Sequence, residues 1–248
     1  MSTGDPYAAL GDGYARRRRP DPRIAAAIAQ ALGDARSVVN VGAGAGSYEP
    51  TDRLVLAVEP SATMIGQRPP GAAPAVQAFA EDLPFDDRAF DVGLAVLTVH
   101  HWRDPGRGLT ELRRVSRRQV VLTWDPVRIS RMWLVADYLP EIATLEESLA
   151  TLPEIAAALA PASVRPVPVP WDCTDGFLAA NWRRPRAYLD HDVRAGASSI
   201  AALPRAVVER AMRRLRDDLD RGRWHARHRD LLARTSLDVG YRLVVSDG

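Results

Sequence analysis

The spacing of apolar positions in the first half of the chain alternates between short buried strands and amphipathic helices. Residues 22–33 predict a helix, because Ile24, Ile28 and Leu32 fall on one face and a glycine follows the last turn. A second helix is predicted over residues 107–115. Strands that alternate with helices are typical of a parallel, doubly wound sheet. Five short apolar runs predict such strands, over residues 37–41, 53–58, 75–79, 91–98 and 119–124.

The second half of the chain is mainly helical in its pattern. Residues 130–160 and 177–235 are predicted to be mostly helical, and their most regular helix covers residues 205–221. Apolar runs over 164–169 and 241–245 predict a sixth and a seventh strand. The sequence therefore predicts an α/β fold, with a doubly wound, mostly parallel seven-stranded sheet and a helical cap inserted after strands 5 and 6.

Composition narrows the class of protein. An apolar content of 46% supports a sizeable core, and no run approaches the roughly 20 apolar residues of a membrane span. The first residues lack the apolar stretch of a signal peptide. Cys173 is the single cysteine, which excludes a cysteine-based zinc site, and His225 and His228 lack a third ligand at recognisable spacing. We therefore expect a cytoplasmic protein with no metal and no membrane association.

The basic residues are all arginine, 33 in number, yet the formal net charge is only +2. The run from Arg16 to Arg19 fits a nucleic-acid patch, or alternatively a solvated lid or anion-binding segment. Nucleic-acid binders usually show a broader basic excess with interleaved aromatic residues, whereas Asp and Glu balance the arginines of the last third. The composition therefore favours a partner other than nucleic acid.

A glycine-rich loop follows the first predicted strand. Residues 38–46 read VVNVGAGAG, and Gly42, Gly44 and Gly46 let the backbone approach a ligand closely. The dinucleotide fingerprint G-x-G-x-x-G would need a glycine where Ser47 stands, so the loop suits a ligand without a pyrophosphate. A purely structural turn is the alternative interpretation.

The end of the second predicted strand carries Glu59, where a carboxylate can accept hydrogen bonds from both hydroxyls of a ribose. With this residue the sequence resembles the class I S-adenosylmethionine-dependent methyltransferases, specifically the type-11 family. The resemblance covers residues 14–125 and rests on four segments in family order, VVNVGAGAG, VLAVEPSATM, AEDLPFDDRAFDV and LAVLTVHHWRDPGRGLTELRRV.

The resemblance implies a Rossmann-like fold that binds S-adenosylmethionine and releases S-adenosylhomocysteine. It implies that the three loop glycines cradle the methionine portion and that Glu59 holds the ribose. Met64 would then flank the adenine, and Leu97 would offer backbone contacts near the methyl group. The remaining positions that the resemblance places at the cofactor are Asn40, Pro60, Ala80 and Glu81.

Three departures from the family pattern surround this predicted site. Asn40 and Phe79 stand where the family often has aspartate. The segment between Gly46 and Glu59 is too short, and contains a proline, for the usual helix after the loop. We therefore expect the N-terminal segment to compensate, closing over the cofactor with Tyr14 and Arg18 so that an arginine pairs with the cofactor carboxylate.

The predicted fold and the resemblance together assign each part of the chain to a structural region. A length of 248 residues fits one large α/β domain. Helices inserted after the fifth and sixth strands would lie over the carboxyl ends of the strands, where open α/β sheets bind ligands. The parts of a single domain over 1–248 are a lid and first helix (1–33), a cofactor-binding core (34–126), a helical cap (127–162 and 174–236) and the last strands (163–173 and 237–248).

Candidate catalytic residues follow the fourth predicted strand. Methyl transfer from a sulfonium needs positioning, plus a base where the acceptor is protonated. His100 and His101 are candidates for that base, and a packing or lid-orienting role is the alternative. The candidate acceptor-binding residues, which suit a planar acceptor bearing an acidic group, are Trp124, Trp182, Arg183 and Tyr188.

The sequence thus predicts an enzyme that transfers a methyl group from S-adenosylmethionine to an oxygen or nitrogen atom of a small molecule, in bacterial secondary metabolism. One alternative is a protein of this fold with another reaction or with no catalytic role. A second alternative is an RNA methyltransferase guided by the arginine run. We expect a monomer or a homodimer.

Overall fold

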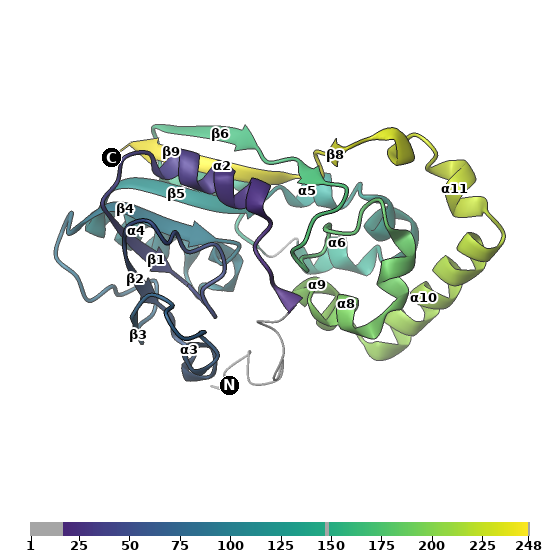
Figure 1. Ribbon diagram of the computed structural model, residues 1–248, viewed down its shortest axis with the longest axis horizontal. Coiled ribbons are helices and arrows are strands. Elements are labelled where there is room, and N and C mark those ends of the chain that lie inside the picture. The colour runs from purple at the N-terminus through teal and green to yellow at the C-terminus, as the bar shows by residue number, and fades with distance from the viewer. Residues whose placement is uncertain (1–16, 147–148, 248) are drawn as a thin grey trace.

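A seven-stranded sheet forms the centre of the computed structural model, which describes residues 17–146 and 149–247 (Figure 1). The strand order is β3-β2-β1-β4-β5-β9-β6. Strands β3 to β5 run parallel, whereas β9 is antiparallel to both of its neighbours. This confirms the predicted Rossmann-like, mostly parallel sheet. Its strands are β1 (Ser37–Val41), β2 (Leu54–Val58), β3 (Ala75–Val76), β4 (Phe90–Val96), β5 (Ser116–Trp124), β6 (Ala162–Pro166) and β9 (Tyr241–Asp247).

Helices flank the sheet and build a second region beyond it. In the first half they are α2 (Pro22–Leu32), α3 (Ala62–Gly66), the short η1 (Val99–His101) and α4 (Pro105–Val115). In the second half they are α5 (Pro126–Ile129), η2 (Leu134–Tyr138), α6 (Glu141–Glu146), α7 (Leu152–Ala158), η3 (Pro185–Leu189), α8 (His191–Ala195), α9 (Ser198–Ala201), α10 (Arg205–Asp220), α11 (Arg223–Arg227) and η4 (Leu231–Ala233). None of the helices within the described residues is long and apolar enough to cross a membrane.

Local capping signals set where the two flanking helices begin. Asp21 accepts a hydrogen bond from the backbone N–H of Arg23 at the start of α2, and Asp104 does the same for Arg107 at the start of α4. Proline occupies the first position of both helices, where its missing N–H costs nothing. This is why α4 begins two residues before the predicted start at 107.

The predicted sixth strand is divided in two. β6 ends at Pro166, and the next paired residues form β7 (Val169–Pro170), which pairs with β8 (Ser236–Leu237) in a separate two-stranded sheet. Proline lacks the N–H that a continuous ladder would require, so the prolines of this segment end the strand early. The predicted third strand is also shorter, since only two residues pair in β3.

The predicted cap differs from the structure in one element. Helix α7 was expected within the cap, but it packs against α4 and β6 beside the sheet. Its apolar residues Ile155 and Leu159 are buried in the same cluster as Leu109 and Leu112 of α4. The helices from η2 to α6 and from η3 to α11 therefore form the cap, and α7 belongs to the layer that covers the sheet.

The cap lies beyond the ends of the parallel strands, with α5 following directly from β5 (Figure 1). One apolar cluster is continuous between the sheet and the cap, and it includes Ile28 of α2, Leu122 of β5, Leu134 of η2 and Leu215 of α10. Shared burial fixes the cap relative to the sheet. The structure thereby places cap residues next to the carboxyl ends of β4 and β5.

Candidate functional site

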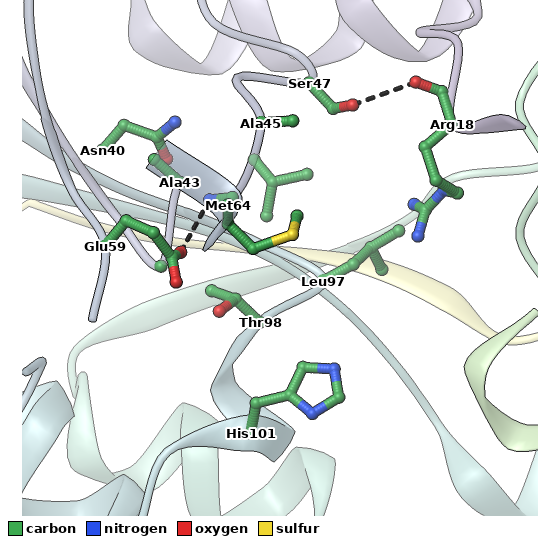
Figure 2. A pocket seen from close by; sticks show the side chains of 13 residues that line it. Arg18, Asn40, Ala43, Ala45, Ser47, Glu59, Met64, Leu97, Thr98 and His101 are labelled. Carbon is green, nitrogen blue, oxygen red and sulfur yellow. Dashed lines mark hydrogen bonds between the residues drawn. The ribbon is translucent and has the colours of Figure 1, made fainter. Parts of the chain in front are cut away.

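A cavity that opens to solvent lies at the carboxyl ends of β1, β2 and β4 (Figure 2). Its position matches the general rule that open α/β sheets bind ligands beyond the strand ends. The residues that line it are Arg18, Asn40, Gly42, Ala43, Gly44, Ala45, Ser47, Glu59, Met64, Val96, Leu97, Thr98 and His101.

The glycine loop forms one wall of this cavity. Gly42, Gly44 and Gly46 have φ values of 70°, 53° and 95°, in the left-handed region that favours glycine. A Cβ on Gly42 would lie 2.0 Å from the hydroxyl oxygen of Thr98. A side chain at this position is therefore excluded by contact as well as by backbone conformation.

Glu59 holds the loop from the end of β2. Its side chain is buried, and one carboxylate oxygen accepts a hydrogen bond from the backbone N–H of Gly44 at 2.8 Å (Figure 2). The other carboxylate oxygen accepts from the N–H of Ser61 at 3.0 Å. Glu59, which was predicted to bind the ribose, thus also fixes the distance between the glycine loop and α3.

The polar groups of the cavity fit S-adenosylmethionine. Glu59 lies on the cavity wall and can accept hydrogen bonds from ribose hydroxyls. The amide oxygen of Asn40 is buried without a hydrogen-bond partner, which costs free energy unless a ligand donates to it. Met64 and Leu97 supply apolar surface, and Arg18 lines the cavity with its guanidinium paired to Asp175. The residues present therefore match a ligand with hydroxyl and ammonium groups.

Several predicted cofactor residues lie elsewhere. Pro60, Ala80 and Glu81 are not among the residues that line the cavity. Ala80 is buried in the apolar cluster beneath α4. The Glu81 carboxylate accepts a hydrogen bond from the backbone N–H of Asp104, just before α4 begins. Tyr14 lies outside the described residues.

Some cavity residues were missed by the sequence reasoning. Thr98 lies two residues after the end of β4, and its contact with Gly42 depends on the pairing of β1 with β4. Ser47 donates a hydrogen bond from its hydroxyl to the backbone carbonyl of Arg18 at 3.1 Å, which brings the N-terminal segment to the loop. Ala43, Ala45 and Val96 also line the cavity and are next to predicted residues in the sequence. Their small or apolar side chains gave no chemical signal of a binding site.

A second cavity adjoins the first between the strand ends and the cap. Arg18, Leu97 and His101 line both cavities. The sheet side contributes the predicted Trp124, which packs on His100 with ring centroids 4.2 Å apart. The other residues that line it are His100, Ile129, Phe177, Leu178, Gly196, Ala197, Ser198, Ser199 and Tyr241.

The two histidines lie at the junction of the cavities. Their ring centroids are 3.7 Å apart, and by accessible surface His100 is partly buried whereas His101 is exposed. Desolvation of the ring and, after it, the positive charge of Arg18 lower the pKa of His101 from 6.5 to about 4. Burial, followed by His101 and Arg18, lowers the pKa of His100 well below 6.5. Both rings are therefore neutral at pH 7.

Three predicted acceptor residues are not at the second cavity. Trp182 is fully buried and donates its indole N–H to the carbonyl of Val169 at 3.0 Å. Tyr188 is also buried and donates its hydroxyl to the carbonyl of Leu178 at 2.6 Å. Arg183 lies over the ring of Trp171 instead, with its guanidinium carbon 4.9 Å from the ring centroid. Trp182 and Tyr188 therefore pack in the core of the cap, and none of the three residues lines the second cavity.

The arginine run is tied down by ion pairs with the cap. Arg18 pairs with the fully buried carboxylate of Asp175 at 2.7 Å. Arg17 pairs with Asp192 at 2.9 Å near the surface. Within the part of the chain that the structure describes, no group of three or more His, Cys, Asp and Glu residues could hold a metal ion.

Comparison with known proteins agrees with the methyltransferase fold and cofactor site described above. The family described as a methyltransferase domain matches residues 39–123. A solved structure of a candidate methyltransferase from an antibiotic biosynthesis pathway of Anabaena variabilis is 31% identical, with a TM-score of 0.86, over 93% of this chain and 98% of that one.

Two further similarities are weaker. Geranyl diphosphate C-methyltransferase from Streptomyces coelicolor, solved with S-adenosyl-L-homocysteine, is 18% identical with a TM-score of 0.51, over 91% of this chain and 77% of that one, so it shows the fold alone. A stretch of 41 residues is 46% identical to the uncharacterized protein YafE of Escherichia coli strain K12. That match spans 16% of this chain and 20% of YafE.

Proposed function

We propose a small-molecule acceptor for this chain, which belongs to the class I S-adenosylmethionine-dependent methyltransferases of the type-11 family. The methyl group goes to an oxygen or nitrogen atom of that acceptor. S-adenosylmethionine, when bound, supplies the methyl group from its sulfonium.

The observation that carries this proposal is the wall shared by the two cavities. Leu97 and His101 line both, so a ligand in one cavity would lie beside a ligand in the other. The second cavity lies between the strand ends and the cap, where open α/β sheets bind their ligands. Its aromatic residues Trp124, Phe177 and Tyr241 suit a planar acceptor.

The low pKa of His101 limits the kinds of acceptor that this residue could deprotonate. With its pKa near 4, the imidazole is unprotonated at pH 7 and can accept a proton, but it is a weak base. General bases work best when their pKa lies near the working pH. We therefore propose an acceptor that is easily deprotonated, such as an acidic hydroxyl or a carboxylate, or one that reacts as a neutral nitrogen.

The ion pairs of the arginine run argue against the RNA alternative. Two arginines of the run, Arg17 and Arg18, are paired with Asp192 and Asp175, which offsets the charge that phosphates would need. The likeness to a protein from an antibiotic biosynthesis pathway supports secondary metabolism as the metabolic setting. A reaction other than methyl transfer remains the alternative that an activity assay must test.

The direct test uses S-adenosylmethionine with a labelled methyl group. The enzyme is incubated with a small-molecule extract, and separately with tRNA, and the label is followed in each fraction. We expect label in low-mass products that are stable to ribonuclease. Label in tRNA alone, or in neither fraction while S-adenosylhomocysteine binds, contradicts the proposal.

A pair of variants tests the second cavity as the acceptor site. Phe177→Ala removes part of the cavity wall and should lower methyl transfer about tenfold or more, with S-adenosylhomocysteine affinity nearly unchanged. Phe85→Ala is the matched control, because Phe85 packs on Phe90 in the other apolar cluster. Equal activity loss in both variants would point to general destabilisation and remove the support for this site.

A further inference from the structure

The segment after the glycine loop is held by a buried ion pair. Residues 47–53 contain no helix, and Arg68, just beyond α3, reaches back to the loop. Its guanidinium donates to both carboxylate oxygens of Glu49 at 2.7 and 2.8 Å. The side chains of Arg68 and Glu49 are only 6% and 8% exposed, so both charges depend on this contact.

The same guanidinium also holds the backbone on both sides. It donates to the carbonyl of Gly44 at 3.2 Å and to the carbonyl of Ala73 at 2.9 Å. Gly44 is the glycine whose N–H is bound by Glu59. Arg68 therefore connects the glycine loop to the β2–β3 connection, as the missing helix would otherwise have to do.

The ion pair continues into the cavity wall through Asn40. The amide nitrogen of Asn40 donates to Glu49 at 3.1 Å. A carboxylate can only accept hydrogen bonds, so it fixes which end of the amide faces it. The amide oxygen then has no hydrogen-bond partner and is buried, although Asn40 lines the first cavity. Figure 2 shows this oxygen on the side of Ala43.

We propose that Arg68 and Glu49 are positioning residues, which orient Asn40 so that its amide oxygen accepts a hydrogen bond from the ammonium group of S-adenosylmethionine. An aspartate at position 40 would place a negative charge at the cavity wall. In this protein the negative charge is on Glu49, which contacts Asn40 on the side away from the proposed ammonium group. Arg68 balances this charge and holds it in place. The inference concerns cofactor binding and does not depend on the acceptor proposed above.

The contact with Glu49 requires an uncharged hydrogen-bond donor at position 40. Asn40→Asp would place two carboxylates at hydrogen-bond distance within a buried site, which raises the cost of ionising both. We expect this variant to bind S-adenosylhomocysteine about tenfold more weakly. The double variant Asn40→Asp with Glu49→Gln restores a donor opposite an acceptor, so we expect its affinity to return to within about threefold of the wild type.

A ligand pair identifies the group that Asn40 binds. The probes are S-adenosylhomocysteine and the analogue that lacks its amino group, both measured by calorimetry on the full chain. Asn40→Ala should lower the affinity for S-adenosylhomocysteine about tenfold and leave the analogue unchanged. Equal losses for both ligands would overturn the proposed contact with the ammonium group.

A second pair of variants separates positioning from simple stability. Glu49→Leu with Arg68→Leu removes both buried charges together, which can preserve folding. We expect it to melt cooperatively but to bind S-adenosylhomocysteine at least about tenfold more weakly. The control is Glu111→Leu with Arg114→Leu, an ion pair on α4 and away from the cavity, which should not change affinity. Wild-type affinity in the first double variant would overturn the proposal.

Discussion

Gly42 shows how closely a single residue can constrain the cofactor cavity. Its φ of 70° and the 2.0 Å approach to Thr98 both penalise a side chain. We predict that Gly42→Ala lowers the free energy of unfolding by about 2 kcal/mol, and S-adenosylhomocysteine affinity more than about tenfold. Urea denaturation and calorimetry measure the two effects.

Gly71 provides the matched control for that prediction. It also has a positive φ, of 85°, but a Cβ there would meet no atom within 4 Å. Gly71→Ala should therefore cost only the backbone strain, about 1 kcal/mol, without affecting cofactor affinity. If the two variants behave alike, the contact with Thr98 has no role in binding.

The histidine at the junction of the cavities should make folding stability depend on pH. The pKa of His101 falls from 6.5 in the unfolded chain to about 4 in the folded protein. Between these two values the unfolded state binds more protons, so stability increases with pH in this window. It is fully present above pH 6.5 and is lost as pH falls toward 4.

Comparison of wild type with His101→Gln isolates this effect from that of the carboxylates. The glutamine does not titrate, so the variant should lose less stability than the wild type between about pH 7 and about pH 5. Urea midpoints at several pH values provide the measurement. Parallel pH profiles would mean that His101 stays protonated as easily in the folded protein as in the unfolded chain.

At the scale of elements, the contact between the N-terminal segment and the cap rests on unequal ion pairs. Asp175 is fully buried and Arg18 nearly so, whereas Asp192, the partner of Arg17, is largely exposed. Removing Arg18 leaves a buried carboxylate without its counter-ion, although Tyr48 still donates its hydroxyl to Asp175 at 2.9 Å. We predict that Arg18→Met lowers the free energy of unfolding by about 3 kcal/mol.

Arg17→Met is the control for this element. Exposed ion pairs contribute little, so its cost should stay below about 1 kcal/mol. Both variants are compared by urea denaturation under the same conditions. A small effect of Arg18→Met would show that the remaining hydrogen bonds satisfy Asp175, and that the segment is not anchored by its charge.

At the scale of the whole molecule, the continuous apolar cluster implies that cap and sheet unfold together. Leu94 of β4, Leu134 of η2 and Trp224 of α11 belong to the same cluster. We predict a single urea transition in which tryptophan fluorescence and far-ultraviolet circular dichroism coincide. S-adenosylhomocysteine at about 100 times its Kd should stabilise the whole protein by about 2.7 kcal/mol. Two separate transitions would show that the cap folds on its own.

Local sequence signals predicted those strands, helices and turns whose conformation is determined by residues close together in the sequence. The apolar runs located the strands, because a strand buried on both faces must be apolar throughout. The glycine spacing located the loop, since only glycine adopts those positive φ values without strain. Glu59 followed from its place at a strand end. The division of β6 from β7 was also present locally, in the prolines, but the apolar spacing outweighed it.

The sequence by itself thus determined the sheet, the cofactor loop and the family chemistry, all of which follow from the backbone conformation and burial of neighbouring residues. Only the tertiary structure decided the polar partners. Arg18 and Asp175 are 157 positions apart, and Arg68 and Glu49 are 19 apart, so no local spacing relates them. The tertiary structure also decided that Trp182 fills the core and Trp124 a cavity wall, because packing against distant elements, and not residue type, determines which aromatic side chain remains accessible.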